Sequence, residues 1–204
     1  MKRNAKQSKG KIMITTQTPA AVLYEEHTAI SHVLDYVDQA VRLIESGKRV
    51  DPSLFADFQE FYARFVGQCH HGKEEQLAFP VLRGSLPDQG PALIDTLENE
   101  HARGATLAAA FAAAVDDYTA GGQDTVPTLA EAARAYVGFL REHILRENEQ
   151  LLPLLAKMPA DQTAIMAAFD RFEEDVMGKG THERLHQMID TLGPRLAREE
   201  AASR

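Results

Sequence analysis

Apolar residues recur every three or four positions along four long stretches of the chain, a spacing typical of helices that bury one face. Thr18 and Asp51 each precede a proline, and a capping residue followed by proline is a favourable helix start. Glycine-containing segments separate the stretches. The pattern predicts helices over residues 18–46, from 51 to a turn at 85–90, over 91–119 and over 125–155.

Short connections between these helices require neighbours to run in opposite directions. The expected fold is all-α, an antiparallel up-down-up-down four-helix bundle over residues 18–156. Residues 157–204 should form a helical extension packed on the bundle, with short helices over 160–177 and 181–192 and an end at Gly193-Pro194. Residues 1–17 are expected to be a disordered basic tail. Pro80 is expected to break or kink the second helix.

The composition narrows the class of protein. The chain has 204 residues, enough for one domain with a sizeable core, and a net charge of −8, which argues against nucleic-acid binding. No stretch approaches the ~20 apolar residues of a membrane-spanning helix. A lone cysteine, Cys69, excludes an intramolecular disulfide and favours a cytoplasmic location, and we interpret it as a small buried helix residue.

The main chemical signal is a His-x-x-x-Glu pattern that occurs twice. His70 and Glu74 form the first copy, and His143 and Glu147 form the second. Residues four apart on a helix project from the same face, about one turn from each other. Each glutamate precedes a proline by six residues, which indicates that the two segments are copies of one unit.

The repeat extends upstream of both pairs. His27 lies 43 residues before the first pair, and His101 lies 42 residues before the second. Each half of the chain therefore reads as a single histidine followed by a His-x-x-x-Glu pair. The candidate ligands are His27, His70, Glu74, His101, His143 and Glu147.

These residues resemble the hemerythrin-like, or HHE cation-binding, family. The motifs that carry the resemblance are EEH at 25–27, HHGKEEQLAFP at 70–80, ENEH at 98–101 and HILRENEQLLP at 143–153. The resemblance covers roughly residues 20–156. It implies a hemerythrin-like four-helix bundle with two iron ions, bridged by an oxo or hydroxo group and held by the six residues above, for which zinc or manganese could substitute.

Physical chemistry supports a metal at these positions. A carboxylate buried inside a bundle is unfavourable unless a cation compensates its charge. Glu74 and Glu147 could each bridge two ions, with histidines in the remaining positions. Mixed nitrogen and oxygen ligands suit iron or manganese.

The third helix departs from the oxygen-carrier hemerythrins, which have a second histidine four residues after the first. Here Ala105 stands four residues after His101, with Gly104 and Ala108 on the same face. The sequence therefore predicts an open position on one metal, which a diatomic gas or peroxide could occupy. The missing fifth histidine puts reversible oxygen carriage in doubt.

Several other residues could be mistaken for ligands. His71 and Glu75 form a second pair beside the first, but alignment of the two halves on their prolines selects His70 and Glu74. We therefore interpret His71 and Glu75 as peripheral residues or as outer partners of the ligands. The segment His182–His186 matches the H-E-x-x-H zinc motif, but lacks a third ligand, and is interpreted as a solvated amphipathic helix. His32 is expected on the surface.

Outer partners for the histidine rings are harder to choose. Tyr24, Glu98 and Tyr136 have suitable spacings, although ordinary packing or solvation explains each of them better.

Two classes of function remain open. One is a binding module that senses a gas, stores iron or delivers iron for the repair of iron–sulfur clusters. The other is a di-iron oxidoreductase acting on dioxygen, peroxide or nitric oxide. The sequence leaves the oligomeric state open.

Overall fold

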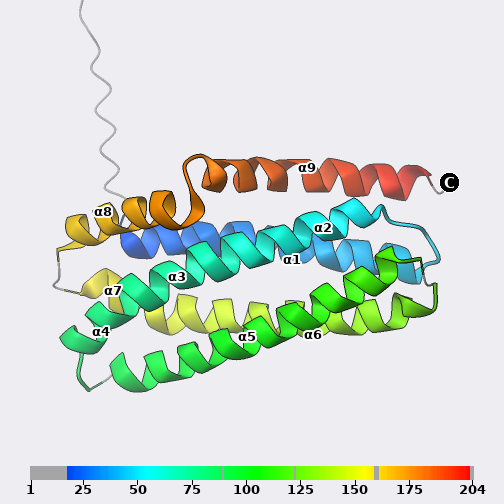
Figure 1. The fold of residues 1–204 in the computed structure, drawn as a ribbon. Helices are drawn as coiled ribbons and strands as arrows, with labels where there is room; N and C mark the ends of the chain where they lie inside the picture. The colour runs from blue at the N-terminus through cyan, green and yellow to red at the C-terminus, as the bar shows by residue number, and fades with distance from the viewer. Residues whose placement is uncertain (1–17, 89, 122, 159–160, 203–204) are drawn as a thin grey trace, which may run out of the picture.

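The computed structural model describes residues 18–88, 90–121, 123–158 and 161–202, and within these ranges it contains helices and no strands. Four long helical segments lie alongside one another, and successive segments run in opposite directions (Figure 1). They are α1 (Pro19–Glu45), the run from α2 (Pro52–Glu60) to α4 (Phe79–Ser85), α5 (Gly90–Thr119), and the run from α6 (Val126–Arg146) to α7 (Leu152–Lys157). The all-α prediction is confirmed.

The helix starts follow the local sequence. Thr18 accepts a hydrogen bond from the backbone N–H of Ala21, and Asp51 accepts one from that of Ser53, so both cap the helices that follow them. A proline occupies the first turn of each helix, where its missing N–H removes no internal hydrogen bond. A short 3₁₀ turn, η3 (Gln123–Thr125), leads into α6.

The second helical segment does not break at Pro80. It continues through η1 (Phe61–His70), α3 (His71–Lys73) and η2 (Glu74–Ala78) into α4, and the two η segments have π-helical hydrogen bonding. A proline lacks an N–H and crowds the carbonyl four residues earlier, and the wider π turn accommodates both effects. A π-helical segment also precedes the proline of the second copy, as η4 (Glu147–Leu151) just before Pro153.

The apolar core is divided into two clusters along the bundle axis. One cluster includes Leu23, Phe79 and Leu155, and the other includes Ile30 and Phe65. The boundary falls at the same level in all four helical segments, and buried histidines and glutamates occupy it. A polar layer therefore crosses an otherwise apolar interior.

The last helix of the C-terminal extension is longer than predicted. It consists of α8 (Gln162–Phe172), η5 (Glu173–Met177) and α9 (Thr181–Ala202), and α9 continues through Gly193-Pro194 instead of ending there. Leu192 and Leu196 are fully buried on either side of the proline, so packing outweighs the lost backbone hydrogen bond. A Cβ at Gly193 would lie 2.9 Å from the Tyr36 hydroxyl oxygen, so a larger residue there would have to displace the Tyr36 side chain.

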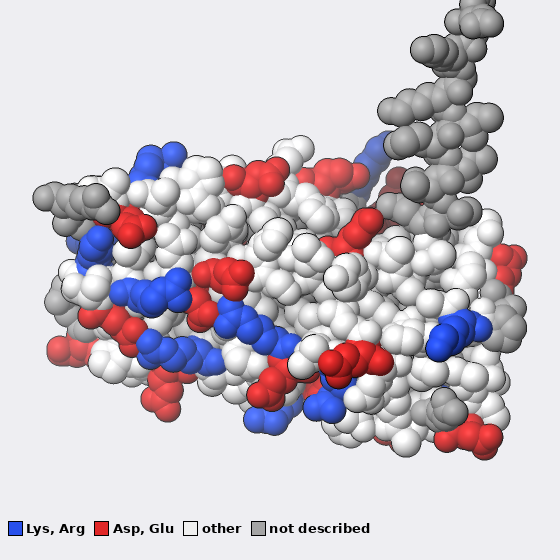
Figure 2. Space-filling view, turned by 180° about the vertical axis from the view of Figure 1, so that it is seen from behind, with Lys and Arg blue, Asp and Glu red and all other residues white. Residues whose placement is uncertain are grey.

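The surface and the termini leave several predictions untested. No helix in the described ranges is long and apolar enough to cross a membrane. On the face seen in Figure 2, acidic and basic side chains are interspersed. The predicted absence of nucleic-acid binding stays a prediction, and the basic tail predicted at residues 1–17 lies outside the described residues.

We expect Leu192→Ala to destabilise the whole protein, because Leu192 is fully buried where α9 packs on the bundle. Loss of a buried leucine side chain should reduce the free energy of unfolding by about 2–5 kcal/mol. Urea denaturation measures this change, with the exposed Gln187→Ala as the control. An unchanged midpoint would mean that α9 unfolds independently of the bundle.

Candidate metal centre

The six side chains singled out by the repeat converge in the polar layer. All are at most 5% exposed, and they come from α1, the second helical segment, α5 and the fourth helical segment. The Nε2 atom of His27 lies 3.1 Å from that of His70 and 3.1 Å from Glu147 Oε2. The Nε2 atom of His101 lies 3.5 Å from Glu74 Oε2 and 3.6 Å from Glu147 Oε1. His143 Nε2 lies 3.1 Å from Glu147 Oε1.

Several of these atoms, and Nε2 of the neighbouring His71, have no hydrogen bond among the described residues, although some of them lie at ion-pair distance from one another. Such atoms normally cost about 1–3 kcal/mol each when buried, so a cluster of them requires an explanation. Imidazole nitrogens and carboxylate oxygens are donors that iron, manganese and zinc accept. The residues present therefore fit a metal ion. The unpartnered atoms are both carboxylate oxygens of Glu74 and of Glu147, and the Nε2 atoms of His71, His101 and His143.

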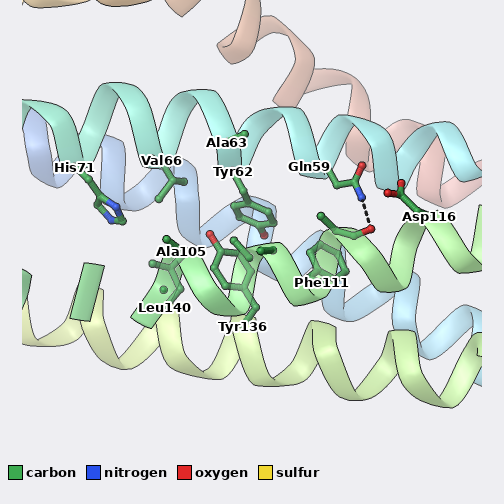
Figure 3. Close-up of a pocket in the computed structure, with 15 residues that line it drawn as sticks. Gln59, Tyr62, Ala63, Val66, His71, Ala105, Phe111, Asp116, Tyr136 and Leu140 are labelled. Atoms are coloured by element: carbon green, nitrogen blue, oxygen red, sulfur yellow. Dashed lines mark hydrogen bonds between the residues drawn. The ribbon is translucent and has the colours of Figure 1, made fainter. Parts of the chain in front are cut away.

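His71 lies against the site and places a ring nitrogen near those of two candidate ligands, whereas the sequence suggested a peripheral residue or an outer partner. Its ring stacks on that of His101, with centroids 3.9 Å apart, and meets that of His143 edge-on at 5.5 Å. Ring nitrogens of the three histidines lie within 4.8 Å of one another. Figure 3 shows His71 reaching from the second helical segment into the space beside Ala105. The open position predicted beside Ala105 therefore faces a histidine.

The charges inside the layer balance one another. Burial alone would raise the pKa of Glu147, but the surrounding histidines hold it well below its usual value. Burial alone would lower the pKa values of His27 and His143, but Glu147 raises both. A bound metal would take the place of the protons that compensate the carboxylates. Burial and neighbouring histidines lower the pKa of His71, which keeps its ring neutral and able to donate a nitrogen lone pair.

Four of the histidines form a hydrogen bond through Nδ1 with an oxygen atom on the side away from the site. When Nδ1–H donates to an oxygen, the Nε2 lone pair is directed into the site, as in many metal sites in proteins. Both the tautomer and the ring orientation are thereby determined. The four contacts are His27 to Asn148 Oδ1 at 2.8 Å, His70 to Glu26 Oε2 at 2.8 Å, His101 to Glu75 Oε1 at 2.7 Å, and His143 to Glu100 Oε2 at 2.9 Å.

These outer partners follow the same repeat as the candidate ligands. Glu26 directly precedes His27 and accepts from His70, the paired histidine of the same half. The second half repeats this arrangement with Glu100, which directly precedes the single histidine of that half. The acid before each single histidine was the available signal, and the sequence analysis missed it. Glu75 is an outer partner with a partly exposed carboxylate, which is one of the two roles that the sequence suggested for it.

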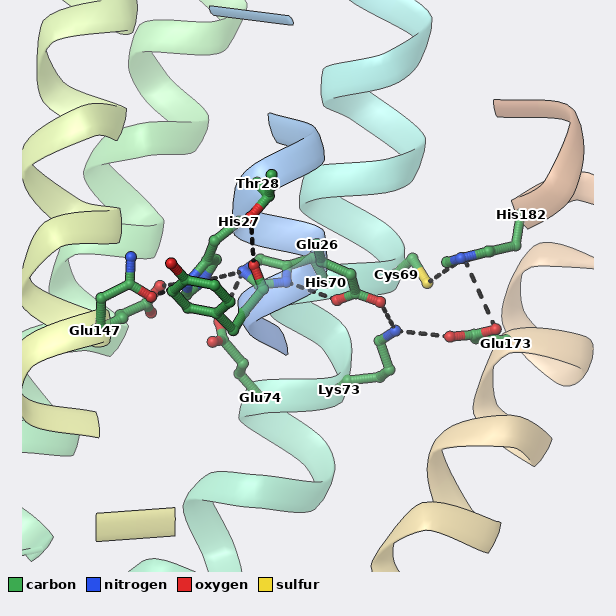
Figure 4. Close-up of polar contacts among 12 residues, drawn as sticks. Glu26, His27, Thr28, Cys69, His70, Lys73, Glu74, Glu147, Glu173 and His182 are labelled. Atoms are coloured by element: carbon green, nitrogen blue, oxygen red, sulfur yellow. Dashed lines mark hydrogen bonds and ion pairs between the residues drawn. The ribbon is translucent and has the colours of Figure 1, made fainter. Parts of the chain in front are cut away.

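A second cluster of potential ligands lies behind His70. Glu26, Cys69, Glu173 and His182 place donor atoms within 4.8 Å of one another. The ammonium group of Lys73, which is fully buried, donates to Glu26 and, at 2.7 Å, to Glu173 (Figure 4). This cation offsets one of the two carboxylate charges, and Glu26 also accepts from His70, so we assign the cluster a structural role in joining η5 to the bundle.

The surroundings of the remaining candidate residues show that they do not contact the ligand histidines. Tyr24 is 57% exposed, Glu98 pairs with Arg83 on the surface, and Tyr136 packs in the apolar core, so none contacts a ligand histidine. His32 is exposed, as expected. Burial raises the pKa of the Cys69 thiol to about 12, in agreement with a structural residue.

The H-E-x-x-H segment is less solvated than predicted. His182 is 20% exposed and packs against the ring of Phe65, as does His186. The Nε2 atoms of the two histidines lie 3.0 Å apart. The prediction of an amphipathic helix packed on the bundle describes this segment, but its histidines face inward.

Comparison with known proteins agrees with this geometry. The model of the hemerythrin HHE cation-binding domain matches residues 18–155. The chain belongs to this family. An uncharacterized protein of Mycobacterium bovis and two of Mycobacterium tuberculosis are each 27% identical to it over 135 residues, 65% of this chain and 51% of theirs. The HHE-family chain thus spans about half the length of these curated relatives. No solved structure matches it.

We expect Glu75→Ala to weaken metal binding while leaving the fold intact. Glu75 is exposed on one side and holds His101 through Nδ1 on the other. Loss of such a partner typically reduces metal affinity by about 10–100-fold. Competition with a chromophoric chelator measures this affinity. Glu98→Ala removes the same charge from the protein surface, and equal affinities in the two variants would contradict the assigned role of Glu75.

Proposed function

We propose that this chain binds two iron ions inside the bundle and that the centre binds or reacts with dioxygen, peroxide or nitric oxide. The proposed ligands are His27, His70, Glu74, His101, His143 and Glu147, together with His71. The observation that carries the proposal is the group of buried nitrogen and carboxylate atoms without hydrogen-bond partners. Family membership supports a cation. Mixed nitrogen and oxygen donors suit iron or manganese, and the resemblance to the hemerythrin-like family leads us to choose iron.

The protein's own residues would do three things at such a centre. Glu74 and Glu147 lie between the histidines of both halves and would hold the ions together with them. The outer carboxylates keep the rings oriented. The apolar clusters above and below limit the access of water. Bound iron would supply the redox chemistry and the coordination position that a small oxidant requires.

His71 removes the reason for favouring turnover of an oxidant over reversible oxygen binding. The doubt about reversible oxygen binding rested on a set of four histidines, and His71 increases the number of available histidines to five. Reversible binding and turnover are both compatible with this donor set. Reversible spectral changes with dioxygen would indicate a carrier or sensor, whereas consumption of peroxide or nitric oxide would indicate an oxidoreductase. Iron storage or delivery for iron–sulfur cluster repair, without turnover, is the alternative.

The bound metal should stabilise the fold, because it binds the native state and compensates buried carboxylates. Removal of the metal by a chelator should lower the melting temperature of the wild-type protein. Glu147→Ala should abolish most metal binding and this response, whereas the exposed Glu149→Ala should retain both. Elemental analysis and thermal denaturation provide the measurements. Equal metal contents in the two variants would contradict the proposal.

His71→Ala should weaken the binding of one of the two ions. Its ring nitrogen shares a site with those of His101 and His143, so the variant leaves two nitrogen donors where there were three. We expect a loss of affinity on the order of tenfold or more for that ion. A metal titration that resolves the two binding steps tests this expectation, with the exposed His32→Ala as the control. Two unchanged binding steps would exclude His71 as a ligand.

A further inference from the structure

A cavity of about 410 Å³ lies between η1 and α5, and His71 is the proposed ligand among its described lining residues. It is elongated, with His71 at one end and Gln59 and Asp116 at the other (Figure 3). Water occupies roughly 30 Å³ per molecule, so the cavity far exceeds the needs of a diatomic gas. Its volume falls in the range of about 300–1,000 Å³ that is typical of pockets for organic ligands.

Small residues on the two facing helices keep this space open. Those on α5 include Ala105 and Ala108, and Gly67 lies opposite them. A Cβ atom at Gly67 would meet only the Tyr62 backbone oxygen, at 3.5 Å, which is an ordinary contact. The fold therefore does not need glycine here for close packing. This glycine therefore leaves the cavity unfilled on its side, and we call the open space between the two helices the groove.

A second, independent observation points to a ligand. Tyr62 lines the cavity and projects into the space between the helices, where Figure 3 shows it near Tyr136. It is only 4% exposed, and its hydroxyl group has no hydrogen-bond partner among the described residues. A buried hydroxyl of this kind normally has a partner. A hydroxyl-type group on a bound molecule would supply one.

The charge of the lining restricts the chemical class of the molecule. The described lining residues are mostly apolar and include no lysine or arginine, while Asp116 is acidic. A carboxylate or phosphate would therefore lose its hydration without gaining a counter-ion. A neutral molecule with a long apolar part meets no such penalty.

We propose that this groove binds a neutral, elongated organic molecule with one hydroxyl-type group, such as a medium-chain alcohol, and holds one end of it beside His71. Binding in the groove does not depend on the proposed iron centre, whereas the placement of the molecule next to a metal rests on that proposed function. The two parts are therefore tested separately.

The first experiment measures binding to metal-free protein. The neutral fluorophore N-phenyl-1-naphthylamine should bind saturably with one molecule per chain, and 1-decanol should displace it more strongly than decanoate. Gly67→Leu and Ala105→Leu fill the groove and should weaken binding of the fluorophore at least tenfold. Ala110→Leu, an exposed change on α5 outside the groove, should have no effect.

The Tyr62→Phe variant tests the polar contact. It should weaken the binding of 1-decanol by about threefold to tenfold, as expected for one hydrogen bond, and leave the affinity for the fluorophore unchanged. The proposal would be overturned if the fluorophore does not bind saturably, or if Ala105→Leu and Ala110→Leu weaken its binding equally. It would also be overturned if decanoate displaces the fluorophore as strongly as 1-decanol does. A further outcome would also overturn the proposal. If the wild-type protein is a dimer that does not bind the fluorophore, and Gly67→Leu dissociates this dimer, a second chain occupies the groove.

The second experiment uses metal-loaded protein. Addition of 1-decanol should shift the optical spectrum of the wild-type centre, and Gly67→Leu should abolish the shift. Binding to the metal-free protein without any spectral shift would keep the groove site and overturn its placement beside the metal. Failure to load metal at all would overturn the proposed function and leave the result of the first experiment intact.

Discussion

The carboxylates of Glu74 and Glu147 have no exposed surface, and the rest of the bundle has to compensate their negative charge. An uncompensated charge in an apolar interior is costly, so each glutamate needs positive partners within a few ångströms. Histidines from all four helical segments supply them, as protonated rings or as ligands of a shared cation. The apolar clusters on both sides of this layer make the compensation necessary, because they exclude the water that would otherwise provide it.

The outer hydrogen bonds extend this arrangement across the bundle. His27 on α1 is held by Asn148 on η4, and His101 on α5 is held by Glu75 on η2. Each contact joins one half of the sequence repeat to the other, whereas Glu26 and Glu100 act within their own halves. Because every helical segment both contributes a histidine and supports one, a change in one outer partner should alter ring orientation without removing a ligand.

Spacing alone identified six converging residues, since the proline-anchored repeat is a property of the sequence and the bundle preserves it. It failed for His71 because the alignment of the two halves sets aside a histidine that only one half carries, and Ile144 stands at the matching position. The π-helical segments η1 and η2, which flank His71, also change which positions face inward. It failed at Gly193-Pro194 for another reason. Burial of Leu192 and Leu196 comes from long-range packing, and no local rule for helix ends includes it.

The position of His71 connects the candidate centre to the groove. Its Nε2 atom is buried without a partner among the described residues, and its ring forms the end of the cavity that Ala105 and Gly67 keep open. The small residues on α5 therefore have a different consequence from the one that the sequence suggested. They do not simply leave a coordination position free, because a histidine from the second helical segment reaches that side of the site. They leave room for a molecule to lie along the helices, with its end beside His71, which is itself one of the proposed ligands.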